Sequence, residues 1–242
     1  MELTGKTALV TGAARRVGRV IALELAERGV AIALHHHQSI EQAGETAAEI
    51  KAKGVEVATF GADLTDPSEA DHLARDVMER FGGVDILVHS AAIFLRTPIG
   101  MVKPADWDRL FALNVRAPFL LTQALTPTLR DRRGHVVMIT DVGGVLPWTG
   151  YLPYGASKAG LIYLTRGLAK ALAPHVHVNA VSPGTVLPPP EATDAEVTAE
   201  AERAALRRIG TAEDVARAVA FLCESEFITG QVLAVDGGKL LA

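Results

Sequence analysis

The chain has 242 residues, of which 49% are hydrophobic and 21% charged, so it contains enough apolar material for one large core, and we expect residues 1–242 to form a single domain. Its formal net charge of −4 gives no net positive field, which argues against nucleic acid as a partner. One cysteine excludes an internal disulfide and fits a reducing compartment. The first residues have no signal-peptide pattern, and no apolar run approaches membrane-spanning length, so we expect a cytoplasmic protein without a membrane partner.

Short runs rich in β-branched residues alternate with longer segments of helical periodicity along the whole chain. Because the intervening segments are long enough for helices, the pattern predicts a doubly wound α/β fold of the Rossmann type. Its seven-stranded sheet should be mostly parallel, with helices on both faces. The predicted strands are Thr7–Val10, Ala31–Leu34, Val55–Phe60, Ile86–Val88, Val136–Thr140, Val176–Val181 and Val232–Val235.

Two helix starts and one break in composition stand out further along the chain. Asp66 to Glu69 reads as an N-cap followed by proline and an acidic third position, and Thr211 to Asp214 resembles a second capped start. The segment Pro183 to Thr198 contains three consecutive prolines and then an acidic, alanine-rich stretch. We expect a mobile substrate lid with a short helix around residues 185–208, and an ordinary surface loop is the alternative.

A glycine-rich turn follows the first predicted strand and leads into an amphipathic segment. Backbone N–H groups and the positive end of a helix dipole at such a turn are suited to bind a phosphate. Arg16 can donate charge-assisted hydrogen bonds to a pyrophosphate or to an anionic or carbonyl-bearing substrate, and the alternative is that it only solvates a helix end. The candidate cofactor-binding residues of this turn are Gly12, Arg15, Arg16, Val17 and Gly18.

The second predicted strand ends in three histidines and two polar residues. Dinucleotide-binding folds that prefer NAD carry an acid at this point, and this chain has none. His36, His37, Gln38 and Ser39, with added charge from Arg15, therefore predict a site for the 2′-phosphate of NADP(H). A metal site is the competing interpretation, but adjacent strand residues point to opposite faces and no other ligand cluster supports it, so we expect no metal.

Three side chains downstream suggest catalysis. Tyr154 and Lys158 are four residues apart, so on a helix they share a face with the ammonium near the phenol. Lysine together with an oxidised nicotinamide should lower the pKa of the tyrosine. Asp141 lies thirteen residues before Tyr154. An ionised carboxylate only accepts hydrogen bonds, so we expect a substrate that offers N–H groups.

The order of these motifs resembles the short-chain dehydrogenase/reductase family, whose tetrad is Asn, Ser, Tyr and Lys. The segments TGAARRVG, LHHHQS and ITGQVLAVDGG, with Asp141 in place of serine, further resemble pteridine reductases and dihydromonapterin reductases. The motifs that carry the resemblance are the phosphate turn, Asn114 in LNVRAPF, Asp141, Tyr154, Lys158, Pro183 with Gly184, and Asp236 with the two following glycines.

The resemblance implies roles for further residues. Asn114 joins the catalytic group, holding the helix and a water that links Lys158 to solvent. Phe94 is expected to stack on the ligand, with core packing as the alternative, and Trp148 is expected at the substrate mouth with Tyr151, with burial against the lid as the alternative. For Asp63 the alternative is a role as a helix cap. The remaining implied cofactor contacts are Asp63, Leu64, Ser90, Ala91, Ala92, Pro183 and Gly184.

The resulting hypothesis is an NADPH-dependent reductase that transfers hydride to a C=N bond of a pterin-type substrate, with dihydrofolate as a possible second substrate, and that works as a homotetramer. Activity should rise toward mildly acidic pH because Asp141 and Tyr154 share a proton. One alternative is a carbonyl or 3-oxoacyl reductase in which Asp141 acts protonated. Another is a non-catalytic NADP(H)-binding sensor or scaffold.

Overall fold

The computed structural model describes residues 1–188 and 192–241, and it contains one sheet of seven parallel strands in the order β3-β2-β1-β4-β5-β6-β7. β1 lies beside both β2 and β4, where the strand order reverses, so that Val10 is in register with Leu34 on one side and with Val88 on the other. The strands are β1 Thr7–Thr11, β2 Ala31–His36, β3 Val57–Gly61, β4 Ile86–His89, β5 His135–Ile139, β6 His177–Pro183 and β7 Val232–Val235.

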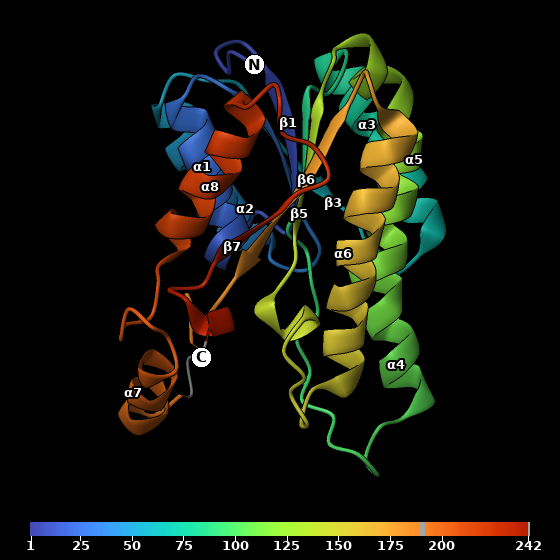
Figure 1. Ribbon diagram of the computed structural model, residues 1–242. Helices are drawn as coiled ribbons and strands as arrows, with labels where there is room; N and C mark the ends of the chain where they lie inside the picture. Colours follow the sequence, from blue (N-terminus) through green and yellow to red (C-terminus); the bar gives the residue numbers. More distant parts are fainter. Residues whose placement is uncertain (189–191, 242) are drawn as a thin grey trace.

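Helices follow most strands and form a layer on each face of the sheet (Figure 1). None of the helices in the described part of the chain is long and apolar enough to cross a membrane. The helices are α1 Arg16–Glu27, α2 Ile40–Ala52, α3 Pro67–Phe81, α4 Pro104–Phe111, α5 Ala117–Asp131, α6 Leu152–Leu172, α7 Asp194–Glu202 and α8 Ala212–Glu224, with a π-turn at Ala112–Arg116 and 3-10 turns at Val142–Gly144 and Lys239–Leu241.

The sheet separates two hydrophobic cores. On one face α1, α2 and α8 bury side chains such as Ile21, Ile50 and Val219, and on the other α3, α5 and α6 bury Leu73 and Leu125, among others. Figure 1 shows these two helical layers, with α7 lying apart from the sheet near the C-terminus. The predicted doubly wound architecture is therefore confirmed.

Local predictions agree with the structure in most places. Asp66 caps α3 by accepting a hydrogen bond from the Ser68 amide at 2.8 Å, and Thr211 opens α8 with a reciprocal capping box. The third strand begins two residues later than predicted, because Val55 follows a left-handed glycine turn and packs against the α1 side core outside the strand. A short helix does occur in the predicted lid as α7, while positions 189–191 of that segment lie outside the described residues.

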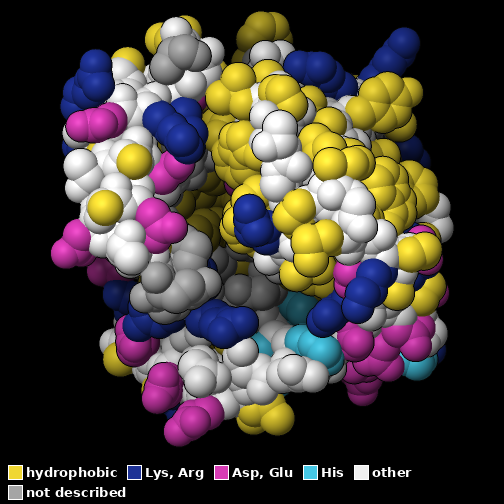
Figure 2. Space-filling model, turned by 90° about the horizontal axis from the view of Figure 1, so that it is seen from below, with side chains coloured by type: hydrophobic (Ala, Val, Ile, Leu, Met, Phe, Trp, Pro, Cys, Tyr) yellow, Lys and Arg dark blue, Asp and Glu magenta, His cyan; other side chains and the backbone are white. Residues whose placement is uncertain are grey.

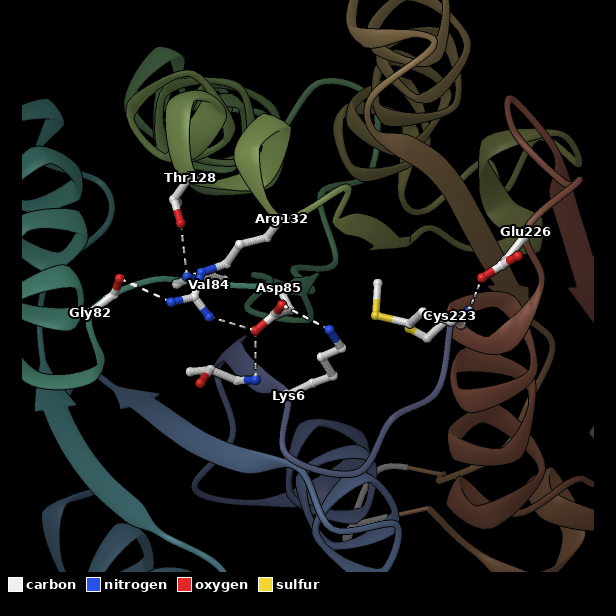
Figure 3. Close-up of polar contacts among 10 residues, drawn as sticks. Lys6, Gly82, Val84, Asp85, Thr128, Arg132, Cys223 and Glu226 are labelled. Atoms are coloured by element: carbon white, nitrogen blue, oxygen red, sulfur yellow. Dashed lines mark hydrogen bonds and ion pairs between the residues drawn. The ribbon is translucent and has the colours of Figure 1, made fainter.

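The amino end of the sheet is closed by an ion cluster around Asp85 (Figure 3). The Asp85 side chain is 4% exposed, and its Oδ2 accepts hydrogen bonds from the Thr7 amide and from Arg132 Nη1, both at 3.0 Å. Lys6 Nζ lies 3.6 Å from the other carboxylate oxygen. This carboxylate thereby ties β1 and the start of β4 to the end of α5.

Candidate active site

A cleft of about 1560 Å³ opens at the carboxyl ends of the strands, where the strand order reverses. Ligands of open α/β sheets bind at this position, and the volume exceeds that of a typical small-molecule pocket, so a dinucleotide and a substrate can share it. Figure 2 looks at this end of the molecule and shows the hollow, with lysine and arginine side chains along its rim. With the exception of Asn114, every residue predicted to contact cofactor or substrate lines the cleft.

The glycine-rich turn is packed too tightly for side chains. Gly12 has a φ of +66°, and a Cβ there would lie 2.9 Å from the Ala91 Cα. A Cβ on Gly18 would lie 2.3 Å from the carbonyl oxygen of Gly12. The turn delivers the chain directly into the N-terminus of α1, which has neither a side-chain cap nor an acidic residue in its first turn. Its backbone therefore offers open N–H groups to a phosphate.

Arg16 begins α1 with a left-handed φ of +55°, a backbone conformation that residues other than glycine rarely adopt. Its Nη2 donates a hydrogen bond of 2.8 Å to the carbonyl oxygen of Leu187, in the segment that follows β6. The side chain thus spans the cleft instead of simply facing solvent.

The three histidines at the end of β2 have different environments. His35, a site residue that the strand pattern alone does not indicate, accepts a hydrogen bond from the Gly12 amide at Nδ1, and its Nε2 lies 3.1 Å from the carbonyl oxygen of Ala62. Burial lowers its pKa to about 4, so it is neutral. His36 is buried with Nδ1 directed at the carbonyl oxygen of His37. His37 and Gln38 are exposed to the cleft, and the Ser39 side chain makes no capping hydrogen bond in α2.

Asp63 sits beside these histidines after β3. Its Oδ1 accepts hydrogen bonds from the amide and the hydroxyl of Thr65, and these bonds hold its pKa below the usual value. His37 Nε2 lies 3.8 Å from the other oxygen. Asp63 therefore stabilises its own turn, and the N-cap of α3 is Asp66. The neighbouring Leu64 is buried.

The loop after β4 is held by Thr11 and Asn114. Thr11 Oγ1 accepts hydrogen bonds from the amides of Ser90 and Ala91 at 3.0 and 3.1 Å. Asn114, in the π-turn, accepts from the Ile93 amide at 2.9 Å and donates to the Ile93 carbonyl and to Ser157 Oγ. Its side chain does not contact Lys158, so it positions the loop against α6 instead of bonding to the lysine.

Asp141, Tyr154 and Lys158 converge at the centre of the cleft. The Tyr154 hydroxyl donates a hydrogen bond of 2.9 Å to Asp141 Oδ2, and the other carboxylate oxygen accepts 2.7 Å from the Gly143 amide. Lys158 Nζ donates 2.9 Å to the carbonyl oxygen of Ile139 and lies 5.7 Å from the centre of the Tyr154 ring. The shared helical face of Tyr154 and Lys158 on α6 places the ammonium on the protein side of the phenol.

Burial governs the protonation of all three groups. It raises the pKa of Asp141 above its ordinary value, and it raises that of Tyr154 well above 10.0, with a further increase from the Asp141 charge. Burial also lowers the pKa of Lys158 to about 8, although the Asp141 charge opposes this. Burial and the adjacent carboxylate thus act on the Tyr154 pKa in the direction opposite to that expected from Lys158, whose ammonium donates to the Ile139 carbonyl; the expectation that lysine and an oxidised nicotinamide together lower this pKa stays a prediction.

Aromatic rings form the outer wall beside the tyrosine. Phe94 is 51% exposed, stacks on Tyr151 at 4.6 Å between ring centres, and meets Tyr154 edge-on at 4.8 Å. Trp148 meets Tyr151 edge-on at 6.2 Å. Phe94 is thus not a core residue, and the wall offers an apolar surface to a substrate.

A polar cluster that the sequence pattern does not predict lies at the other side of the cleft. Lys239 from the C-terminal 3-10 turn donates hydrogen bonds to Glu200 of α7 and to Thr185, and Arg203, directly after α7, also donates to Glu200. These residues come from three separate segments, so no spacing pattern connects them. The only available signal was a lysine directly after the Asp-Gly-Gly motif. Within the described residues, no group of three or more potential ligands could hold a metal ion.

Comparisons with known proteins agree with this geometry. A family described as enoyl-(acyl carrier protein) reductase matches residues 12–239. A 3-oxoacyl-[acyl-carrier-protein] reductase from Staphylococcus aureus is 38% identical, with full coverage of both chains. A short-chain dehydrogenase from Burkholderia cenocepacia, solved with NADP, is 36% identical over 99% of this chain and 100% of that one, with a TM-score of 0.94. A blue fluorescent protein from a metagenomic library, solved with NADPH, is 34% identical over 99% of both, with a TM-score of 0.93.

These relatives overturn the expectation of a pterin substrate. That expectation depended on an ionised Asp141 acting only as an acceptor, whereas full-length relatives at this identity are named 3-oxoacyl reductases. The structure supplies the physical reason. Both Asp141 oxygens already accept hydrogen bonds from the protein, and burial favours the neutral acid, so a carboxyl group here does not by itself select a ligand rich in N–H groups.

Proposed function

Because the chain belongs to the short-chain dehydrogenase/reductase family, we propose that it is an NADPH-dependent oxidoreductase that reduces the ketone of 3-oxoacyl-type compounds. The observation that carries the proposal is the hydrogen bond between Tyr154 and Asp141 above Lys158, inside a cleft large enough for nucleotide and substrate. The alternative of a non-catalytic sensor has no comparable support, since a sensor needs no buried phenol paired with an acid.

The cofactor is NADP(H). The Gly12 turn and the open N-terminus of α1 fit a pyrophosphate. The exposed His37 and Gln38, with the half-buried Ser39, suit a 2′-phosphate because no acid at the end of β2 opposes it. Arg15, exposed at the rim, adds positive charge. When bound, NADPH supplies the hydride for the reaction.

Tyr154 is the proton donor in this proposal. Its raised pKa keeps the hydroxyl protonated across the physiological range, which suits a group that must give a proton to the ketone oxygen. Lys158, protonated below its pKa of about 8, stabilises the phenolate that remains. Asn114 positions the loop at Ile93 and so fixes the cleft beside Tyr154.

Asp141 takes the place where the family usually has serine. As a neutral acid it can donate a second hydrogen bond to the ketone oxygen. As a carboxylate it only accepts the hydrogen bond from the Tyr154 hydroxyl, and its charge opposes the negative charge that develops on the ketone oxygen. The acid form is therefore the active one for ketone reduction. Phe94, Trp148 and Tyr151 form the wall against which the acyl part packs.

The test is NADPH oxidation with ethyl acetoacetate and an acetoacetyl thioester. We expect turnover of both, and Tyr154→Phe should reduce kcat/KM by roughly 10²- to 10⁴-fold because the proton donor is lost. Asp141→Ser should increase it by roughly tenfold, since a hydroxyl donates at every pH. Asp141→Asn is the matched control, because it removes the charge at nearly constant shape. Absence of ketone turnover by the NADPH-loaded wild type, in conditions where the protein is folded, would reject the proposal.

A homotetramer remains a proposal that rests on family resemblance. Large apolar side chains are exposed on two sides of the molecule, including Phe119 and Tyr163 on α5 and α6, and Phe221 and Phe227 on and after α8. Burial of such surfaces in contacts between copies accounts for their exposure in the isolated chain.

A further inference from the structure

Lys239 is a buried ammonium in the cleft that the reaction described above does not use. Its side chain is only 8% exposed, and Nζ donates hydrogen bonds of 2.5 Å to Glu200 Oε2 and 3.1 Å to Thr185 Oγ1. The nitrogen also lies 5.4 Å from the centre of the Trp148 ring, at the substrate wall. A desolvated ammonium at this place requires an anion beside it.

The anion present is the carboxylate of Glu200, which is held by several donors. Oε2 accepts from Lys239 and from the Thr185 hydroxyl at 2.9 Å, while Oε1 accepts from Arg203 at 2.5 Å. Burial acts to raise the pKa of Glu200, yet these partners hold it below its ordinary value. The pocket around Lys239 is thus already shaped for one carboxylate group.

Glu200 belongs to an element that is weakly attached to the rest of the protein. No residue of α7 is buried, so its position depends on polar contacts such as the one between Glu200 and Lys239. A helix without an apolar face in the core can move at small cost in free energy. When it moves, Glu200 leaves Lys239 without an anionic partner.

The surrounding charge favours a negatively charged replacement. Among the described residues, seven lysines and arginines line the cleft against four aspartates and glutamates, although the whole chain carries a net charge of −4. Figure 2 shows the positive side chains gathered around the hollow. Such a concentration raises the local concentration of anionic ligands.

We propose that Lys239 is a specificity-determining residue that binds a carboxylate carried by the substrate, and that Glu200 occupies this place until α7 moves. The inference rests on the proposed ketone reduction and specifies its substrate class as oxo compounds with a carboxylate near the ketone. Thr185 and Lys239 recognise one oxygen of that group, in the manner in which they hold Glu200 Oε2.

A 3-oxo acid and its ester test this assignment. Acetoacetate carries a carboxylate one methylene away from the oxo group, and ethyl acetoacetate carries a neutral ester at the same position. The readout is the ratio of kcat/KM for acetoacetate to kcat/KM for the ester. Lys239→Met should lower this ratio roughly 10- to 100-fold, because a charge-assisted hydrogen bond to the carboxylate is lost. Lys239→Arg should preserve a preference for the anion.

Glu200→Gln should change the ratio of kcat/KM values in the opposite direction. It therefore distinguishes binding of the substrate by Lys239 from a purely structural contact between Lys239 and Glu200. It removes the internal competitor while leaving Lys239 in place, so the ratio should rise several-fold. If the pair only fastened α7, both Lys239→Met and Glu200→Gln would change the two substrates in parallel, and that outcome overturns the inference. Lys170→Met, at an exposed position of α6, is the matched control and should leave the ratio unchanged.

A binding measurement makes the inference independent of turnover. The chain has two tryptophans, so Trp107→Phe leaves Trp148 beside Lys239 as the only indole reporter. Acetoacetate added to this variant with NADP⁺ should change its fluorescence with saturation, and Lys239→Met in the same background should abolish the change. Absence of saturation with intact Lys239 overturns the inference even where ethyl acetoacetate is reduced. Lack of turnover of either ketone together with saturable binding instead rejects the proposed reaction.

Discussion

At the amino ends of the strands Asp85 is surrounded by the Thr7 amide, Arg132 and Lys6, whereas at the carboxyl ends Asp141 shares its environment with a phenol and a lysine bonded elsewhere. Both carboxyl groups are largely withdrawn from water, but only the first is matched by cations at close range. The pKa of Asp141 rises as a result. The carboxylate of Asp85, which is paired with cations, stabilises the fold. The carboxyl group of Asp141, which is buried without a close cation, can take part in proton transfer.

The largest difference should appear in the free energy of unfolding. Asp85→Ala leaves the Thr7 amide without its acceptor and Arg132 without its partner, so we expect a loss of about 3 kcal/mol with unchanged kcat of the folded fraction. Denaturant unfolding measures this loss. Asp131→Ala, an exposed acid near the same end, should change stability by less than about 0.5 kcal/mol. Equal effects of the two substitutions would contradict the contrast between the two ends.

The pH dependence of ketone reduction sharpens the comparison at the catalytic end. Because Lys158 has a pKa lowered to about 8, it loses its charge above that pH, and kcat/KM should fall about tenfold per pH unit there. Because the pKa of Asp141 is raised, its neutral acid persists to higher pH than in an exposed aspartate, and kcat/KM should rise from neutral toward mildly acidic pH.

Asp141→Ser provides the control for this profile. It should remove the rise on the acidic side, since the serine does not titrate. It should also move the alkaline fall to lower pH, because the Asp141 charge is what raises the pKa of Lys158 against burial. A profile of the serine variant that matches the wild type on both sides would show that Asp141 does not titrate with the reaction.

The smallest expected effect concerns backbone strain at the cofactor turn. Arg16 has a left-handed φ of +55°, so Arg16→Gly should raise the free energy of unfolding by up to about 1 kcal/mol. The same substitution removes the hydrogen bond to Leu187 and should raise the KM for NADPH. Arg15→Gly, where the backbone is extended, offers no relief and should lower stability slightly. Thermal unfolding and NADPH titration of both variants distinguish strain from function.

The fold could be predicted because its signals are local. Strands such as Ile86–His89 are short apolar runs, and the caps at Asp66 and Thr211 depend on neighbours within three residues. The family could also be predicted, because the phosphate turn, Tyr154 and Lys158 occur along the chain in the order typical of it. The substrate class was predicted wrongly because the ionisation of Asp141 depends on burial, which a sequence pattern does not reveal.

Contacts between distant segments account for the other omissions. Lys239 meets Thr185 and Glu200 only after the C-terminal turn folds back over the cleft, and the partners lie 54 and 39 residues away. The neutral state of His35 likewise results from burial, which lowers its pKa, and its hydrogen bonds join backbone groups that follow two other strands, at Gly12 and Ala62. Neither arrangement leaves a spacing in the chain from which it could be inferred.

His35 has a consequence for how tightly the nucleotide is held. By accepting from the Gly12 amide and bonding toward the Ala62 carbonyl, one imidazole braces the turn after β1 against the loop after β3. Both segments line the cleft. The conformational entropy of ordering these loops is therefore lost when the chain folds and not when the dinucleotide binds. The affinity for the dinucleotide is correspondingly greater than it would be if the loops became ordered only on binding.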